Sequence, residues 1–185
     1  FREFGEMLFT HFGVSGPLVL SASAHLRDWG KEQYRLSIDL KPALDQQKLE
    51  ARILRDISES PNRDVEKLLC GLVPHSMAPV MTRRLGFPPT LKANSLTKEQ
   101  RRGLIELLKH FTISVTGVRP VTEAIVTAGG VKVSEVKPNT MESNLVEGLY
   151  FAGEILDVDA YTGGFNLQIA WATGHLAGVS AAERE

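Results

Sequence analysis

Residues 148–157 read GLYFAGEILD, and shortly after them residues 162–168 read TGGFNLQ. The short apolar run before Gly153 is typical of a buried strand, and a glycine at its end closes it. Gly163 and Gly164 precede a long helical pattern over residues 165–182, in which Gly174 and Gly178 share one face and are expected to let the helix approach a sheet closely. This stretch therefore predicts a strand, a loop and a helix.

The same stretch can hold a ligand. Glu154, directly after the strand, can accept hydrogen bonds from sugar hydroxyls. Gly163 and Gly164 leave the N–H groups of the helix start exposed, and with the helix dipole these favour an anionic or electron-rich group. Such an arrangement suits a flavin, with Glu154 on the ribityl chain and the helix start at the pyrimidine ring, where it would stabilise the anionic reduced form. Glycines needed only for the turn explain the same spacing, so both interpretations stay open at this point.

A resemblance to a known family covers this region and more. Residues 116–178 resemble the C-terminal segment of the NAD(P)/FAD-dependent oxidoreductase family, whose members include a bacterial bile-acid reductase and proteins called aminoacetone oxidases. The matching pieces are residues 126–131 (VTAGGV), 140–143 (TMES), 148–154 and 162–168. Residues 9–17, which read FTHFGVSGP, are similar to a motif in the inserted domain of that family. The combination of pieces is specific, whereas any one of them is not.

The resemblance implies an α+β fold of two parts. Residues 1–115 would be a mixed strand and helix insertion domain, and residues 116–185 an incomplete C-terminal part of an FAD-binding, Rossmann-like α/β domain. No G-x-G-x-x-G follows a strand in this sequence, and that turn binds the FAD pyrophosphate. Since Phe1 also lies within apolar sequence, we expect a C-terminal fragment whose partner is the N-terminal nucleotide-binding region of the same chain. We expect the fragment alone to be inactive and to hold FAD weakly or not at all.

The resemblance also implies the residues of the flavin site. They are Gly153, Glu154, Asp157, Thr162, Gly163, Gly164, Phe165, Asn166 and Leu167. The complete protein is expected to bind FAD, to use NAD(P)H and to act on a small-molecule substrate. No catalytic residue beyond the flavin is identified; His11 is a weak candidate for facing substrate or transferring a proton, and a structural hydrogen bond explains it equally well. The alternative function is a cofactor-free recognition or interaction module.

Composition excludes several other classes of protein. A formal net charge of -1 gives no basic footprint for nucleic acid, and the apolar runs are too short for a membrane span. The single Cys70 leaves no internal disulfide and no cysteine-based zinc site. Asp157 and Asp159 resemble the start of a calcium loop, but Tyr161 and Gln168 stand where further ligands are required. We therefore expect a cytoplasmic protein without a metal, and the resemblance implies that it is bacterial.

The remaining sequence predicts a helical block between strands. Strands are expected at residues 34–40, 111–115, 123–127 and 131–133, the last two around a turn at Gly129-Gly130. Helices are expected after Pro17, over residues 49–57, over 65–72 with Asn62 as cap, over 76–85, and after a capping box of Thr97 and Gln100. Residues 44–110 carry no recognisable chemistry, and the domain boundary is expected near residues 111–117.

Overall fold

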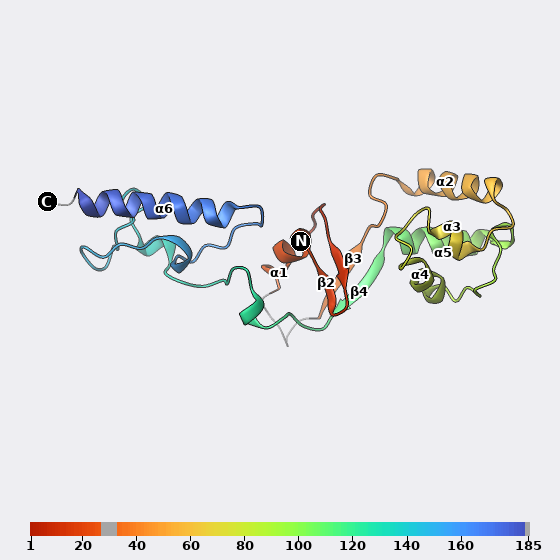
Figure 1. Cartoon of the computed structure of the whole chain (residues 1–185), viewed down its shortest axis with the longest axis horizontal. Coiled ribbons are helices and arrows are strands. Elements are labelled where there is room, and N and C mark those ends of the chain that lie inside the picture. The colour runs from red at the N-terminus through yellow and green to blue at the C-terminus, as the bar shows by residue number, and fades with distance from the viewer. Residues whose placement is uncertain (27–32, 184–185) are drawn as a thin grey trace. The chain divides into compact units, whose positions relative to one another are not determined.

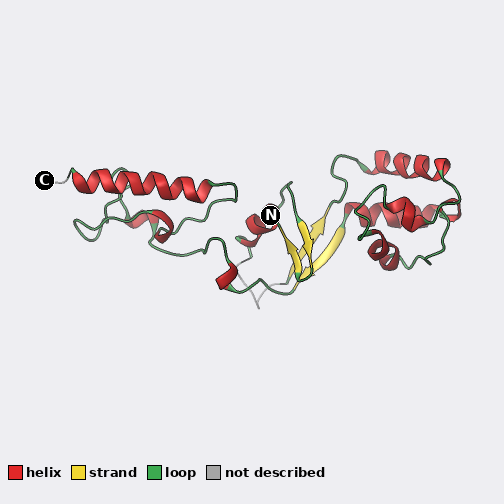
Figure 2. Cartoon of the chain, in the orientation of Figure 1, coloured by secondary structure: helices red, strands yellow, loops and turns green. Residues whose placement is uncertain are grey.

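The computed structural model describes residues 1–26 and 33–183, which divide into two compact units. Residues 33–116 form the middle unit, and the described residues before and after them form the terminal unit. Helices and short antiparallel sheets occur in both, as Figures 1 and 2 show. The predicted α+β class is confirmed. The Rossmann-like character of the C-terminal part and the division into residues 1–115 and 116–185 stay predictions.

The middle unit is a helical block closed by a two-stranded ribbon. Strand β3 (Tyr34–Ile38) pairs antiparallel with β4 (Phe111–Val115), so both predicted strands are confirmed. Side chains alternate along a strand, and Leu36 opposite Ile113 faces inward while its neighbours are exposed. The helices between the strands are α2 (Gln46–Glu59), α3 (Val65–Leu69), α4 (Ala78–Arg84) and α5 (Lys98–Lys109), with a 3₁₀ turn at Ala93–Ser95.

Two of these helices begin at side-chain caps. Before α5, the Gln100 N–H donates to Thr97 Oγ1 at 3.2 Å and the Thr97 N–H donates to Gln100 Oε1 at 3.0 Å, which confirms the predicted capping box. Before α2, Asp45 accepts a hydrogen bond from the Lys48 N–H at 2.8 Å, and this bond lowers the pKa of the Asp45 carboxyl. Both helix starts are therefore specified within four residues of sequence.

The predicted cap of α3 at Asn62 is wrong. The helix begins at Val65, after Asp64, and no side chain caps it. Asp64 Oδ1 instead accepts a hydrogen bond from Lys92 Nζ at 2.6 Å, a partner 28 residues away. The chain around Asn62 is a turn that joins the preceding helix to this one, so Asn62 lies outside the start of α3.

The middle unit has a well-packed core. Fifteen buried apolar residues form one cluster that includes residues from all four helices and the first residue of β4. Its fully buried members include Leu49, Ile53, Leu69, Met81, Leu104 and Leu108. A cluster of this kind excludes water from the interior, so the predicted packed helical subdomain is confirmed.

The terminal unit begins with a small hairpin and a short helix. Strand β1 (Leu8–Thr10) pairs antiparallel with β2 (Gly13–Ser15). Helix α1 (Pro17–Ser23) follows, with its proline in the first turn as predicted. The long helix α6 (Phe165–Ala182) has the bounds that the sequence pattern predicts. Three 3₁₀ turns, at Val121–Glu123, Val133–Glu135 and Gly153–Ile155, lie between them in the chain.

The strands expected in the C-terminal part are wrong. Residues 123–127 and 131–133 form turns and loops, with Ile125 69% exposed. The strand expected before Gly153 is wrong as well, because residues 148–152 form a turn and extended chain in which Tyr150 pairs with Glu142 only as an isolated bridge. Val131 pairs with Leu156 in the same isolated way. A strand is stable when a neighbouring strand takes up its hydrogen bonds, and the described residues supply no such neighbour here.

The core of the terminal unit is small. Its buried residues are Val136, Met141, Leu156 and Ala177, the last of which is the only buried residue of α6. A Cβ added at Gly174 or Gly178 would meet no atom within 4 Å, so the close approach to a sheet expected for these glycines is not seen among the described residues. Within residues 1–26 and 33–183, no helix combines the length and the apolar character that crossing a membrane needs.

Candidate functional site

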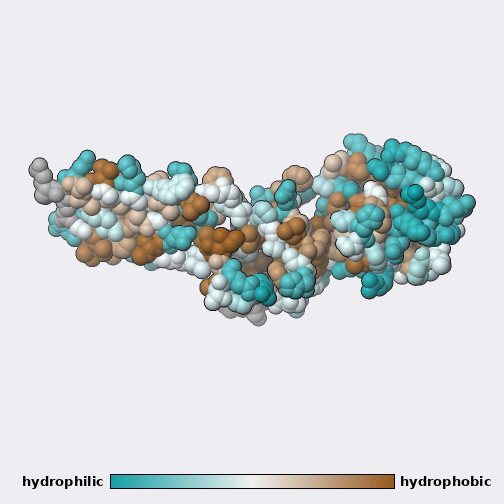
Figure 3. Space-filling view, in the orientation of Figure 1, coloured by the Kyte–Doolittle hydropathy of each residue, from teal (hydrophilic) through white to brown (hydrophobic). Residues whose placement is uncertain are grey.

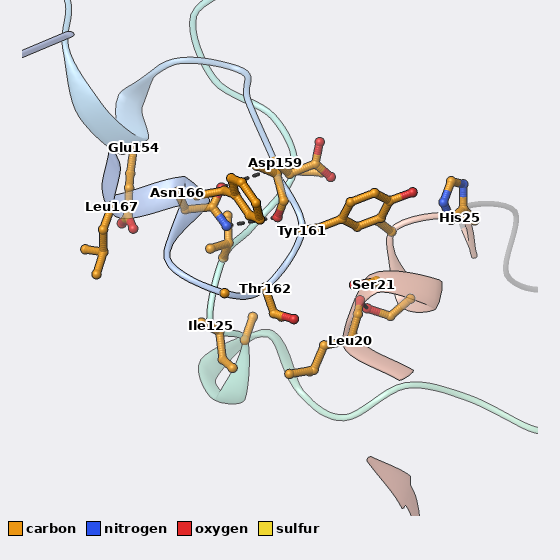
Figure 4. Close-up of a pocket in the computed structure, with 18 of the residues that line it drawn as sticks. Leu20, Ser21, His25, Ile125, Glu154, Asp159, Tyr161, Thr162, Asn166 and Leu167 are labelled. Atoms are coloured by element: carbon orange, nitrogen blue, oxygen red, sulfur yellow. Dashed lines mark hydrogen bonds between the residues drawn. The ribbon is translucent and has the colours of Figure 1, made fainter. Parts of the chain in front are cut away.

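A hollow of about 1490 Å³ lies in the terminal unit. Three segments border it: residues 154–167, residues 124–129 and residues 20–26 at the end of α1, and Figure 4 shows labelled members of each. The predicted flavin-site residues that line it are Glu154, Asp157, Thr162, Gly163, Gly164, Phe165, Asn166 and Leu167. The remaining predicted residue, Gly153, adjoins Glu154 in the chain. The residues that the sequence motifs grouped together therefore line one hollow. Their role in binding a flavin stays a prediction.

Glu154 lies in the 3₁₀ turn Gly153–Ile155, which is tied to α6. The Gly153 N–H donates to Thr173 Oγ1 at 2.9 Å, and Thr173 Oγ1 in turn donates to the Ile169 carbonyl at 2.6 Å. The Glu154 side chain is exposed to the hollow and forms no ion pair with the described residues. Its position is thus set by the backbone, while its carboxylate is available to accept hydrogen bonds from a ligand.

The start of α6 is open to the same hollow. Gly164 precedes the helix with a φ of +90°, a left-handed conformation that strains any residue with a Cβ, and no side chain caps the helix. The N–H groups of Phe165, Asn166 and Leu167 belong to the first turn and have no acceptor four residues earlier in the helix. Uncapped N–H groups at the positive end of the helix dipole can bind an anionic or electron-rich group.

Asn166 also closes the loop before α6. Its Oδ1 accepts a hydrogen bond from the Ala160 N–H at 2.8 Å, and its Nδ2 donates to the Ala160 carbonyl at 2.9 Å, as the dashed lines in Figure 4 show. The sequence analysis placed Asn166 among the flavin-site residues without a role for its side chain. The general tendency of asparagine side chains to bond nearby backbone could have indicated this clamp.

Residues 129–131 pack tightly against the loop that carries Asp157. The Gly129 N–H donates to Asp157 Oδ1 at 3.0 Å, and the Val131 N–H donates to the Ile155 carbonyl at 2.8 Å. A Cβ at Gly130 would lie 2.5 Å from that Ile155 oxygen, so this position requires glycine. Asp157 therefore has a structural contact in addition to its place on the hollow.

The structure does not bring His11 to the hollow. It lies in the turn between β1 and β2, is exposed, and contacts Phe12 edge to face with ring centroids 5.1 Å apart. The hollow has lining residues that were not predicted from the sequence, among them Leu20, Ser21, His25, Ile125, Asp159 and Tyr161. No sequence signal links α1 to a loop more than a hundred residues later. Among the described residues, no group of three His, Cys, Asp or Glu side chains is placed to hold a metal ion.

Comparison with known proteins identifies the family. A family model described as the HI0933-like protein barrel and H2TH domain matches residues 1–126. The chain belongs to the HI0933-like family. This is the oxidoreductase family of flavoprotein type that the sequence motifs resemble.

Curated relatives match along almost the whole chain. The 3-dehydro-bile acid delta(4,6)-reductase of Clostridium scindens is 34% identical over 99% of this chain. The ribosomal RNA dihydrouridine synthases of Escherichia coli and Haemophilus influenzae are 34% and 32% identical over 94% and 96% of it. The chain spans 45%, 41% and 42% of the length of these three relatives.

Proposed function

We propose that this chain contributes the flavin-ring and ribityl half of an FAD site to a longer oxidoreductase. One observation carries the proposal: the free carboxylate of Glu154 and the uncapped start of α6 border the same hollow. A carboxylate suits sugar hydroxyls, and an uncapped helix start suits an electron-rich ring, so the donors and acceptors present fit this half of FAD.

Each residue would have a distinct part in holding the cofactor. Glu154 would accept hydrogen bonds from the ribityl hydroxyls, and the N–H groups after Gly164 would bond the pyrimidine edge of the ring. Asn166 would keep the loop before α6 in the shape that leaves these groups exposed. When bound, FAD supplies hydride transfer from a nicotinamide cofactor to the substrate.

The exposed apolar side of α6 supports the proposal that this chain is part of a longer protein. Leu167 and Trp171 are 54% and 67% exposed, and Gly174 and Gly178 continue the same helical face with open space above them. An apolar helix is normally buried. We infer that further chain, including the pyrophosphate-binding turn that these 185 residues lack, covers this face in the complete protein.

The names of the relatives suggest the reaction class. One is a delta(4,6)-reductase and two are synthases of dihydrouridine, and both chemistries add hydrogen across a carbon–carbon double bond. We propose that the complete protein reduces a carbon–carbon double bond conjugated to a carbonyl. The names include both a small molecule and an RNA, so the proposal concerns the class of reaction and not the substrate.

The proposal is tested by Glu154→Ala in the complete protein. Loss of charge-assisted hydrogen bonds worth about 1.5–3 kcal/mol should weaken FAD binding roughly tenfold to hundredfold. Titration followed by flavin fluorescence measures the dissociation constant. Glu183→Ala, an exposed acid at the other end of α6, is the matched control and should leave that constant unchanged.

An unchanged dissociation constant in the Glu154 variant would refute the assignment of the ribityl contact. Absence of any FAD binding by the complete, folded protein would favour a cofactor-free recognition module. The 185-residue chain by itself should show almost no visible flavin absorbance, because the pyrophosphate turn is missing.

A further inference from the structure

The hollow in the terminal unit is larger than half of one cofactor requires. Its volume is about 1490 Å³, whereas sites for small molecules usually have about 300–1,000 Å³. The proposed flavin contacts, Glu154 and the start of α6, border one side of the hollow. The end of α1 and residues 124–126 border other parts of it, so space remains for a second molecule.

Tyr161 lies in this remaining space. It belongs to the loop before α6, and its side chain points from that loop toward His25 at the end of α1, as Figure 4 shows. The side chain is 51% exposed, and its hydroxyl forms no hydrogen bond with residues 1–26 or 33–183. The phenol is therefore available to bond a molecule in the hollow.

The backbone on both sides of Tyr161 is held in place. Ala160, directly before it, forms two hydrogen bonds with the Asn166 side chain, at 2.8 and 2.9 Å. After it, Gly163 and Gly164 have φ values of +112° and +90°, which a residue with a Cβ rarely adopts. Because Asn166 belongs to the first turn of α6, these bonds fix the loop of Tyr161 relative to the helix start where we propose the flavin ring.

The other acidic and basic side chains that line the hollow are less suited to donate a proton. Enzymes use His, Glu, Asp, Lys, Tyr and Cys for this step. Asp157 already accepts a hydrogen bond from a backbone N–H at 3.0 Å, and Asp159 has a contact of its own. Glu154 borders the side proposed for the ribityl chain. His25, whose ring stacks on that of Phe1 with centroids 4.4 Å apart, is the remaining rival.

Apolar side chains near Tyr161 can hold a carbon skeleton. Leu20 and Ile125 line the hollow and are 36% and 69% exposed, and Ala24 and Val126 line it as well. Figure 3 shows many apolar residues on the visible surface of the terminal unit, whereas hydrophilic residues cover most of that of the middle unit. A mostly apolar lining with a few polar groups is what orients a small ligand in its site.

We propose that Tyr161 is a catalytic residue that donates the proton when a carbon–carbon double bond is reduced. This role rests on the proposed function and deepens it. A hydride from a reduced nicotinamide, passed on by the flavin, forms the C–H bond at the β-carbon, and the π electron pair of the double bond moves to the α-carbon. The O–H bond of Tyr161 breaks, and its proton forms the C–H bond at the α-carbon. The phenolate regains a proton from water on its exposed side.

The test uses the complete protein with FAD bound and chemically reduced in the absence of oxygen, mixed with 2-cyclohexenone or 1-nitrocyclohexene. Tyr161→Phe removes only the hydroxyl, and Tyr34→Phe, in β3 of the middle unit, is the matched control. His25→Gln removes the rival donor. Hydride addition to the nitroalkene gives a nitronate anion that is stable without immediate protonation, so this probe separates hydride transfer from proton transfer.

With 2-cyclohexenone, Tyr161→Phe should reoxidise its flavin about 10²–10⁴-fold more slowly than the unmodified protein, because an enolate needs the proton to become product. With 1-nitrocyclohexene, its rate should stay within about threefold, since this step needs no proton donor. The variant should then release the nitronate, detected by ultraviolet absorbance, where the unmodified protein releases nitrocyclohexane. Tyr34→Phe should match the unmodified protein with both probes.

Four outcomes would overturn the role of Tyr161. They are an unchanged rate with 2-cyclohexenone in Tyr161→Phe, equal slowing with both probes and no nitronate, a loss in His25→Gln without one in Tyr161→Phe, and failure of the unmodified protein to reduce either probe. Equal slowing would mean that the phenol acts only through the shape of the hollow.

The flavin site is judged by a separate measurement, the FAD dissociation constant. Tyr161→Phe should leave this constant unchanged, whereas Glu154→Ala should raise it. Weaker FAD binding in Tyr161→Phe would mean that the phenol holds the cofactor, and would overturn its role as proton donor while leaving the flavin site intact as a proposal. An unchanged constant in Glu154→Ala, with both probes behaving as expected, would refute the ribityl contact and support the proton donor.

Discussion

Helices α5 and α6 differ in how much of their apolar surface is buried and in whether a side chain caps their first turn. In α5, Leu104 and Leu108 are fully buried on one side and charged residues occupy the other, and a capping box satisfies the first turn. In α6, which is longer, Ala177 alone is buried and no side chain caps the start. The amphipathic sequence pattern of α5 gives this helix one apolar face to bury. Helix α6 is apolar on several sides and exposes Trp171.

This difference extends to the units that hold the two helices. The core that includes α5 contains fifteen buried residues, whereas the cluster that includes Ala177 of α6 contains four. The apolar side chains of α5 are buried against other residues of the same unit. In α6, apolar side chains such as Trp171 remain exposed, and we place the ligand at the uncapped start of this helix.

The largest effect is expected at the α5 core. Leu108→Ala removes a fully buried side chain and leaves a cavity, so the free energy of unfolding should fall by about 2–5 kcal/mol. Urea denaturation followed by circular dichroism measures it. A loss below 1 kcal/mol, on the order of a surface substitution, would mean that the α5 core is not close-packed.

A smaller effect is expected at the cap of α5. Thr97→Ala removes the side-chain acceptor of the Gln100 N–H and should lower the free energy of unfolding by about 1 kcal/mol. Thr97→Ser keeps the hydroxyl and should lose much less. If both substitutions had the same effect in the same denaturation assay, the capping bond would not be what stabilises this helix start.

The smallest effect is expected on α6. Trp171→Ala replaces a side chain that is 67% exposed, and in the 185-residue chain it should change the free energy of unfolding by less than about 0.5 kcal/mol. In the complete protein, where we propose that further chain covers this face, the same substitution should cost about 3–5 kcal/mol. Equal effects in the two proteins would contradict a covered face.

Local patterns predicted most of the regular structure. Helical spacing and the Thr97–Gln100 box predicted α5, and the glycine pair before Phe165 predicted α6. The same patterns failed for residues 123–127, 131–133 and 148–152, which have strand-like composition but form no strand. A composition rich in β-branched residues shows that a segment suits a sheet. A strand forms only where a neighbouring strand pairs with that segment.

The sequence by itself determined local features of the candidate site, namely the glycine pair before α6 and the carboxylate of Glu154. It also determined the family, whose model matches residues 1–126. Only the tertiary structure showed that Asp157 bonds Gly129, 28 residues away, and that His11 does not line the hollow. It also showed that Tyr161 and the end of α1, far apart in the chain, border the same hollow. The physical reason is range: caps and turns depend on residues within a few positions, whereas a binding surface depends on side chains that only folding brings together.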